Sequence, residues 1–246
     1  MPVMTVGTGR ALFRGNYNER VLATQPIFYV PENESAGAIS YCLTNPAMNG
    51  AYTAVTLAND PTGPFEMPAP YYDGATSYND IYSIPLNANL TGAECTIGIW
   101  GRVDNVGIWT DGTFRAILIL YVDVNNSLIL RRSNANNTFS WLREGGGVAH
   151  GVNLAGLTTT DWFFAALTVS EAADEWRAYW NGAQAGVTQV GLGAWAGNLN
   201  PLLCLIGAQN QAPANVWNGR IGPGGVWSRA LPPAEIASLS RDLRMV

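Results

Sequence analysis

The clearest alternation of apolar and polar positions along the chain lies between Asp161 and Gly186. From residue 163 every second position is apolar up to residue 169, and the positions between them begin apolar and end polar. A period of two predicts a β-strand, and the apolar start at both sets of positions predicts burial on both faces of a sheet. A second alternation at 175–181 has one apolar face and one amphipathic or charged face.

Two short polar segments predict how these strands are connected. Residues 171–174 separate the first two strands, and Asn181-Gly182 follows the second. An Asn-Gly pair accepts positive φ at both central positions, as the type I′ turn of a tight hairpin requires. The stretch therefore predicts strand, hairpin, strand, tight turn and strand.

Alternating or short apolar runs predict strands elsewhere in the chain. They lie at 27–30, 51–57, 78–84, 95–103, 114–122, 127–131, 138–143, 202–207 and 220–227. Four prolines between Asn59 and Pro70 predict an irregular segment, because proline cannot donate a hydrogen bond to a strand ladder. Many short strands separated by glycine and proline turns predict an all-β fold built as a two-sheet sandwich.

The two ends of the chain have different patterns from the middle. Residues 1–16 are rich in Gly, Thr and Arg with little periodicity, which predicts an extended arm, and 17–23 predict one or two helical turns. Near the C-terminus, prolines at the start and Ile236, Leu239 and Leu243 on one face predict a short helix. We therefore divide the chain into an N-terminal arm, 1–24, and one domain, 25–246.

Five runs share their order and spacing with a known group of β-sandwich domains. They are Ile27 to Glu34, Tyr72-Asp-Gly with Tyr78, Trp162 to Thr168, Tyr179-Trp-Asn-Gly, and Trp217 to Leu239 with its Gly-Arg-Ile and Pro-Pro-Ala-Glu-Ile segments. Together they resemble laminin-G-like, concanavalin A-like domains over residues 25–243. The resemblance implies a two-sheet antiparallel jelly-roll sandwich with a short C-terminal helix, which here would follow the N-terminal arm. Such domains are adhesion and glycan-binding modules, and they also occur in virus and phage structural proteins.

The amino-acid composition limits the classes of molecule that the protein is expected to bind. Charged residues are 13% of the 246 residues, about half the usual share, which favours stable contacts within an assembly. All thirteen basic residues are arginine, which is typical of interfaces, although the base composition of the gene would also explain the absence of lysine. A net charge of −5 would repel a phosphate backbone, so we expect no nucleic acid partner.

The sequence also predicts whether the protein enters a membrane and where it is synthesised. None approaches the ~20 residues that a membrane helix needs, so we expect no membrane partner. Residues 1–7 lack the basic and apolar regions of a signal peptide, so we expect synthesis in the cytoplasm of a host.

Candidate catalytic groups are few. Glycoside hydrolases that share the resembled fold carry Glu-x-Asp-x-x-Glu on one strand, and this run does not occur in the sequence. The nearest clusters are Glu32-Asn-Glu34 and Glu171 with Asp174-Glu175, which we expect in turns, where charges are solvated. His150 and the three cysteines form no recognisable triad or zinc motif. We therefore predict no catalytic residues and no cofactor.

Calcium and glycan sites are left open. Many relatives of the resembled family bind calcium through loops at the rim of the sandwich. Asp73, Asp80, Asp104 and Asp111 are loop carboxylates here, but without a ligand loop of fixed spacing we assign no metal ligands.

We expect most of the nine tryptophans in the core, because burial of so large a side chain is worth far more than a surface contact. Trp195, between glycine-containing turns, is the candidate glycan contact, with packing as the alternative.

The favoured interpretation is a non-enzymatic structural or adhesion protein of a virion, a phage capsid decoration or tail component. In this interpretation the arm contacts other virion proteins or copies of the same chain. The expected contacts are Val6, Arg10, Leu12, Phe13, Arg14 and Tyr17. The alternative is a lectin-like module that binds a glycan or a cell surface, and a third interpretation is a glycoside hydrolase.

Overall fold

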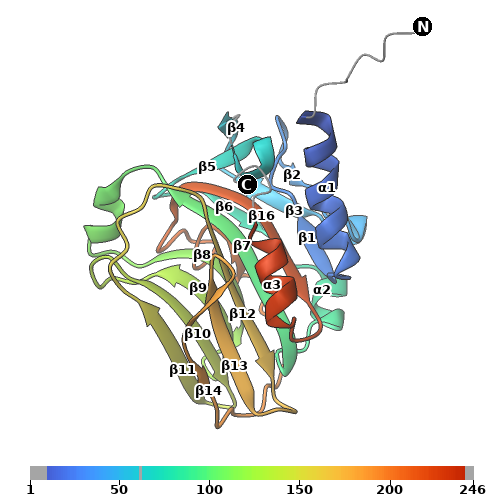
Figure 1. Ribbon diagram of the computed structural model, residues 1–246, viewed down its shortest axis with the longest axis vertical. Coiled ribbons are helices and arrows are strands. Elements are labelled where there is room, and N and C mark those ends of the chain that lie inside the picture. The colour runs from blue at the N-terminus through green and yellow to red at the C-terminus, as the bar shows by residue number, and fades with distance from the viewer. Residues whose placement is uncertain (1–9, 61–62, 242–246) are drawn as a thin grey trace, which may run out of the picture.

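The computed structural model describes residues 10–60 and 63–241, which form two antiparallel sheets of eight strands each, stacked face to face (Figure 1). Sheet A contains β14 (Ala183–Gln189), β13 (Glu175–Trp180), β12 (Phe163–Ser170), β7 (Glu94–Val103), β16 (Asn218–Trp227), β5 (Ala69–Asp73) and β4 (Thr56–Asp60), with β1 (Phe28–Val30) also paired to β16. Sheet B contains β11 (Val148–Leu154), β10 (Phe139–Gly145), β9 (Asn126–Arg132), β8 (Arg115–Asp123), β15 (Cys204–Ile206), β6 (Tyr78–Asp80), β3 (Gly50–Thr53) and β2 (Ile39–Ser40). The two-sheet sandwich predicted from the sequence is confirmed.

Helical segments connect the strands and flank them. The α-helices in the described residues are α1 (Arg10–Ala23), α2 (Ile84–Asn89) and α3 (Pro233–Leu239), and the 3₁₀ turns are η1 (Pro46–Met48), η2 (Pro64–Glu66) and η3 (Val106–Thr110). None of these helices is long and apolar enough to cross a bilayer. The predicted C-terminal helix is confirmed as α3, with Ile236 and Leu239 buried, while Leu243 lies outside the described residues.

The core between the sheets is built around aromatic rings. Phe163 of β12 stacks on Trp180 of β13, with ring centroids 4.3 Å apart, and Phe139 of β10 meets it from the opposite sheet at 5.6 Å. The tryptophans that are fully or almost fully buried are Trp100, Trp109, Trp141, Trp176, Trp217 and Trp227. This confirms that most of the tryptophans pack inside the molecule.

The central hairpin follows the predicted pattern. Strand β12 pairs with both β7 and β13, and β13 pairs with β14. Asn181 (φ 48°) and Gly182 (φ 83°) connect the paired residues Trp180 and Ala183, so both turn positions have the positive φ expected of them.

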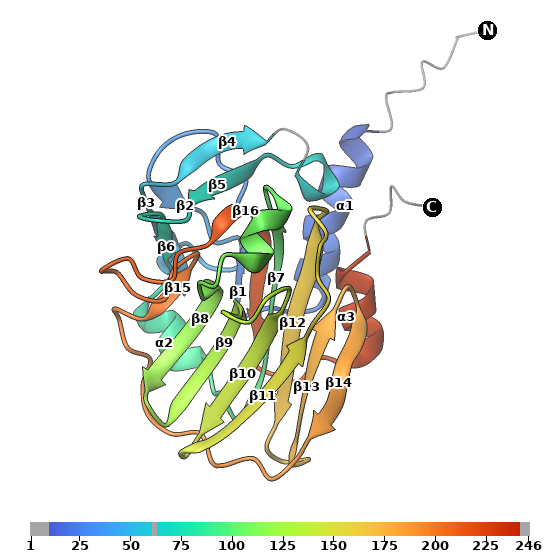
Figure 2. The same cartoon turned by 90° about the vertical axis from the view of Figure 1, so that its left-hand side faces the viewer.

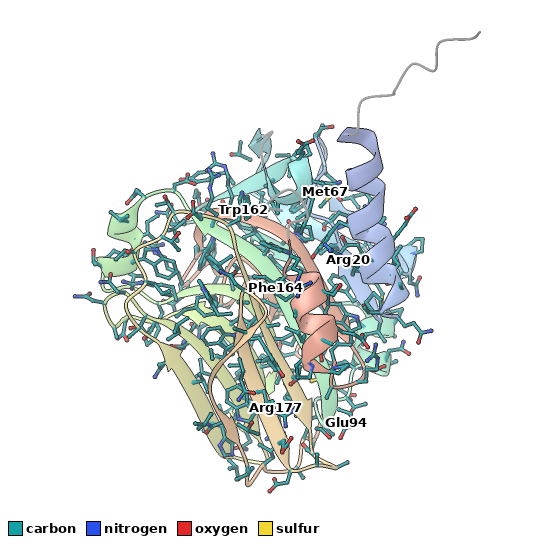
Figure 3. The ribbon with its side chains drawn as sticks, viewed as in Figure 1. Arg20, Met67, Glu94, Trp162, Phe164 and Arg177 are labelled. Atoms are coloured by element: carbon teal, nitrogen blue, oxygen red, sulfur yellow. The ribbon has the colours of Figure 1, made fainter. Side chains whose placement is uncertain are left out.

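Sheet A is buried on its outer face as well, by helices from both ends of the chain. Phe164 and Ala166 of β12 contact a cluster that contains Tyr17 and Val21 of α1 and Ile236 of α3, among others. Figure 3 shows Phe164 and Met67 on this side of the molecule, beside the two helices. Burial of β12 on both faces, predicted from its doubly apolar start, is therefore confirmed.

The extended arm is the part of the prediction that the structure corrects. Residues 10–16 begin α1, so the extended conformation predicted for 1–16 is wrong there, and residues 1–9 lie outside the described chain. The run Arg10-Ala-Leu-Phe-Arg contains good helix formers, and docking of the helix on sheet A stabilises it further.

Further elements were not predicted, among them β5, β11 and α2. Strand β5 contains Pro70, but its pairing with β16 begins only at Tyr71, so the missing N–H does not interrupt that ladder. Strand β11 follows a two-residue turn at Gly146 and Gly147, both at positive φ, where the sequence suggested only the end of a strand. Helix α2 begins at Ile84, the last residue of the strand that the sequence predicts over 78–84.

Comparing two glycines tests the packing of α3 on the central hairpin. Gly182 and Gly156 have nearly equal φ, 83° and 82°, but a Cβ at Gly182 would lie 2.3 Å from Ser240 Oγ, while one at Gly156 would meet no atom within 4 Å. We expect Gly156→Ala to lower the free energy of unfolding by about 1–2 kcal/mol through φ alone. Gly182→Ala should lower it by about 1–3 kcal/mol more. Chemical denaturation measures both, and equal losses would contradict the packing of α3 on this turn.

Candidate functional site

The outer face of strands β8 to β11 is the candidate site, because no helix of the described chain covers it (Figure 2). Along one row of this face lie Leu142, Ile129 and Ile119, directly opposite one another on β10, β9 and β8. Leu142 and Ile129 are half-buried, whereas their inward-facing neighbours Leu128, Leu130 and Trp141 are fully buried in the core. Ile119 is itself buried, so the accessible apolar groups of this row are Leu142 and Ile129.

Polar and aromatic side chains flank this apolar row. Arg131 is opposite Ser140, whose hydroxyl donates to Asn153 Oδ1 at 2.6 Å. The guanidinium carbon of Arg131 lies 4.1 Å from the ring centroid of Phe114. We call this surface the open face; its residues are Phe114, Tyr121, Ile129, Arg131, Ser140, Leu142, Glu144 and Asn153.

A loop closes the other half of the same sheet. Leu205 of β15 is buried beneath Ala208 and Val216, with Tyr78 beside them. Gln211 in this loop donates through Nε2 to Asp80 Oδ2 at 2.7 Å. The open face is therefore limited to β8–β11 and is bordered by the 208–216 loop.

The Glu32 cluster differs from the expectation of a solvated turn. Glu32 is fully buried and accepts four hydrogen bonds. The donors are Asn79 Nδ2 at 2.6 Å, Tyr72 OH at 3.0 Å, Tyr52 OH at 3.1 Å and Ser40 Oγ at 3.3 Å. Tyr72 belongs to sheet A and the other three donors to sheet B, so this carboxyl group connects the two sheets.

The burial of Glu32 changes the protonation of its carboxyl group. Burial, and then the charge of Glu34, raise the pKa of Glu32 to about 8, so its carboxyl group is protonated at neutral pH. Its φ of 52° is unusual for a residue other than glycine. Tyr52 OH shares its one hydrogen between Glu32 and Glu34, with Glu34 Oε2 the nearer at 2.6 Å. Glu34 also accepts from the Tyr41 amide at 2.7 Å, which ties the following segment to the same cluster.

The second acidic cluster holds a loop in place. Glu171 Oε1 accepts from the buried Arg143 at 2.5 Å and from the Trp195 amide at 2.7 Å. Asp174 accepts from the amides of residues 191 and 192, and Glu175 pairs with Arg177. These carboxylates therefore organise the 190–196 loop and the edge of sheet A, and they do not lie on the open face.

Trp195, the candidate glycan contact, lies outside the open face. Its ring is half-buried against the core and lies over Gly92, where a Cβ would come within 2.2 Å of the indole. The structure packs one part of this side chain on the protein, and its role as a glycan contact stays a prediction.

The four loop carboxylates considered for calcium each have protein partners. These are the amides of 75–77 for Asp73, Gln211 and the Tyr82 amide for Asp80, Arg220 for Asp104, and Arg115 with Arg132 for Asp111. In the described residues, no group of three or more His, Cys, Asp or Glu side chains is arranged to hold a metal ion.

The predicted partner contacts are only partly described. Val6 lies outside the described residues, and the structure places only the backbone of Arg10, Leu12, Phe13 and Arg14, in α1. Tyr17 is buried within its own chain: its hydroxyl accepts from Trp100 Nε1 at 2.8 Å and donates to the Leu239 carbonyl at 3.3 Å. Tyr17 therefore fixes α1 to sheet A and α3, and it does not face a partner.

Residues 73–237, about two thirds of the chain, match the family model of the concanavalin A-like lectin/glucanases superfamily. No curated protein shows a matching sequence.

Solved structures share the fold at low identity. Domain 4 of AbnA, an extracellular arabinanase of Geobacillus stearothermophilus solved with arabinotriose, is 13% identical, with 88% of this chain and 98% of that chain covered and a TM-score of 0.64. The CBM40 of the Ruminococcus gnavus IT-sialidase is 13% identical over 69% and 95% of the two chains, with a TM-score of 0.54. The binding domain of botulinum neurotoxin serotype D is 12% identical, with a TM-score of 0.60; the match covers 87% of this chain and 51% of that one, so this chain spans about half its length.

The Glu32 cluster predicts a pH dependence of stability. The pKa is near 4.5 in the unfolded chain and about 8 in the folded one, so between these values only the folded state holds the proton. The free energy of unfolding should therefore fall as pH rises from about 4.5 to 8, by up to about 1.4 kcal/mol per unit from this group.

Glu32→Gln, which keeps the shape but cannot ionise, should remove this part of the slope in denaturation measured across the same pH range. Glu19→Gln, at an exposed position of α1, is the matched control and should keep the wild-type slope. An unchanged slope in Glu32→Gln would contradict the raised pKa.

Proposed function

We propose that this chain, which belongs to the concanavalin A-like lectin/glucanases superfamily, is a non-catalytic binding domain that holds a carbohydrate on its open face. One observation carries the proposal: helices bury the outer face of sheet A, while the matching face of sheet B is left accessible at β8–β11. A sheet face with half-buried apolar and aromatic groups beside amide and hydroxyl groups suits a sugar, which has both C–H and O–H surfaces.

The proposed contacts divide into two kinds. Tyr121, Ile129 and Leu142 would contact the C–H faces of sugar rings, and the exposed Asn153, held by a hydrogen bond from the buried Ser140, would exchange hydrogen bonds with hydroxyl groups. Net gains of about 0.5–1.5 kcal/mol per contact predict weak binding, with a Kd between about 10 µM and 1 mM.

The neighbouring structures support a binding role. They include a carbohydrate-binding module bound to sialyllactose, a toxin binding domain, and an arabinanase domain in complex with arabinotriose. Glycoside hydrolysis needs two carboxyl groups about 5–10 Å apart at the scissile bond. Here the acidic clusters tie sheets and loops together, which favours binding over hydrolysis.

Substitution of Tyr121 tests the proposed face. We expect the purified chain to bind oligosaccharides on a glycan array, and Tyr121→Ala to weaken the binding about tenfold by removing one stacking surface. Tyr41→Ala is the control, because Tyr41 is exposed at the far edge of sheet B, beyond β2. Equal affinities of both variants and the wild type in calorimetry would contradict binding at the open face.

A second function, as a structural component of a virion such as a phage capsid decoration or tail protein, is favoured by a different surface. Ile39, Tyr41 and Leu43 alternate along the segment that contains β2, and they are 44%, 53% and 44% exposed. Three large apolar side chains in one edge segment are typical of a protein contact. Here the chain would bind other virion proteins or copies of itself through this edge.

Co-sedimentation with particles tests this second function. Tyr41→Ser with Leu43→Ser should abolish association with the particle, since it removes apolar surface from the contact while leaving the core unchanged. Tyr121→Ala is the reciprocal control and should associate normally. Association that survives the double substitution would contradict docking through this edge.

A further inference from the structure

Arg131 is a cation on the open face without a carboxylate partner in the described residues. It lies on β9, half-buried, with its guanidinium group over the ring of Phe114. Its Nε is enclosed and has no hydrogen-bond partner. Neither terminal nitrogen donates to the protein, and neither is enclosed, so both are accessible from the open face.

An arginine without a carboxylate partner is unusual on these strands, as the next residue in the sequence shows. Arg132 points to the opposite face of the same strand, donates to two backbone carbonyls and pairs with Asp111 at 3.1 Å. Arg143, fully buried on β10, pairs with Glu171. Both guanidinium groups that point inward are thus compensated by a carboxylate, and the outward-facing Arg131 is not.

The surroundings of Arg131 hold the side chain in a defined position. The Phe114 ring supports one face of the guanidinium plane, which limits the conformational entropy lost when it binds an anion. Partial burial lowers the pKa of Arg131, and no carboxylate lies near enough to counter that shift. An anion at this place would therefore meet a partly desolvated, pre-oriented cation.

The geometry points to a carboxylate as the missing partner. The two terminal nitrogens of a guanidinium group form a planar fork that matches both oxygens of a carboxylate. Asn153, exposed on β11 and held by a hydrogen bond from the buried Ser140 on β10, continues the row, so hydroxyl groups next to the carboxylate would meet its amide. A sugar ring that carries a carboxylate has this combination of groups.

We propose that Arg131 anchors the carboxylate of an acidic saccharide on the open face. The inference deepens the proposed carbohydrate-binding function and rests on it. It assigns to Arg131 the choice of ligand class: sugars with a carboxylate, such as uronic or sialic acids, are bound in preference to their neutral counterparts.

Calorimetry with acid and ester forms of the same sugars tests the proposal. The probes are trigalacturonate and 3′-sialyllactose, each with its methyl ester, which removes the charge and leaves the rings unchanged. We expect the wild-type chain to bind each acid at least about tenfold more tightly than its ester, because the ester cannot form the charge-assisted pair with the guanidinium group. Raising the salt concentration should weaken the binding of the acids only.

Variants assign the preference to Arg131. Arg131→Gln should bind acid and ester equally, and Arg131→Lys, which keeps the charge but not the fork, should retain part of the preference and confirm that the face is still folded. The matched control is Arg177→Gln, an arginine of sheet A that pairs with Glu175; it should keep the full preference.

The outcomes separate the two proposals. Binding of neutral sugars that Tyr121→Ala weakens, with no preference for the acids, would overturn the role of Arg131 and leave the carbohydrate-binding function intact. An acid preference that persists in Arg131→Gln would also overturn that role. No binding of any sugar would overturn both proposals.

Discussion

Two helices from opposite ends of the chain close the outer face of sheet A, and the rest of the structure depends on this closure. Tyr17 of α1 joins the two, through its hydrogen bonds with Trp100 of the sheet and the Leu239 carbonyl of α3. The aromatic side chains on this face would otherwise be exposed to water, at a cost of about 25 cal/mol for each Å² of apolar surface. Sheet A thus becomes a layer buried on both sides, and sheet B is the layer left to contact a ligand.

Buried ionisable groups fix the position of sheet B against this layer. The Glu32 carboxyl group connects β5 of sheet A to three strands of sheet B, and Arg143 of β10 reaches across to Glu171, which follows β12. Such groups are costly to bury unless each is hydrogen-bonded, so they favour one relative arrangement of the sheets. The open face is therefore carried on a rigid support, which suits a binding surface that gains little from each single contact.

Much of this architecture could be predicted from local pattern. The double alternation around Phe163 and the Asn181-Gly182 turn depend on neighbouring residues, and both were found. The buried state of Glu32 could not be predicted, because its partners Tyr52, Tyr72 and Asn79 come together only when distant strands pair. The helix at residues 10–16 was missed because docking on a distant sheet stabilises it.

The location of the candidate site could not be predicted from the sequence, for a related reason. Tyr121 and Arg131 occupy outward positions in two strands that the sequence did predict, but the sequence pattern assigned neither side chain to a face. What it could not reveal is that helices cover one outer face and leave the other open. The Trp195 hypothesis followed the glycines around it, but the indole packs on Gly92, where the lack of a side chain makes room for it.

The most direct test of this account is the map of backbone amide shifts in an NMR titration of the labelled chain with trigalacturonate. The account predicts that the shifts concentrate on β8 to β11, and that amides of β12, β13 and α3 stay unchanged. Shifts centred on sheet A and its helices, or no shifts at saturating sugar, would contradict the claim that the uncovered face of sheet B is the binding surface.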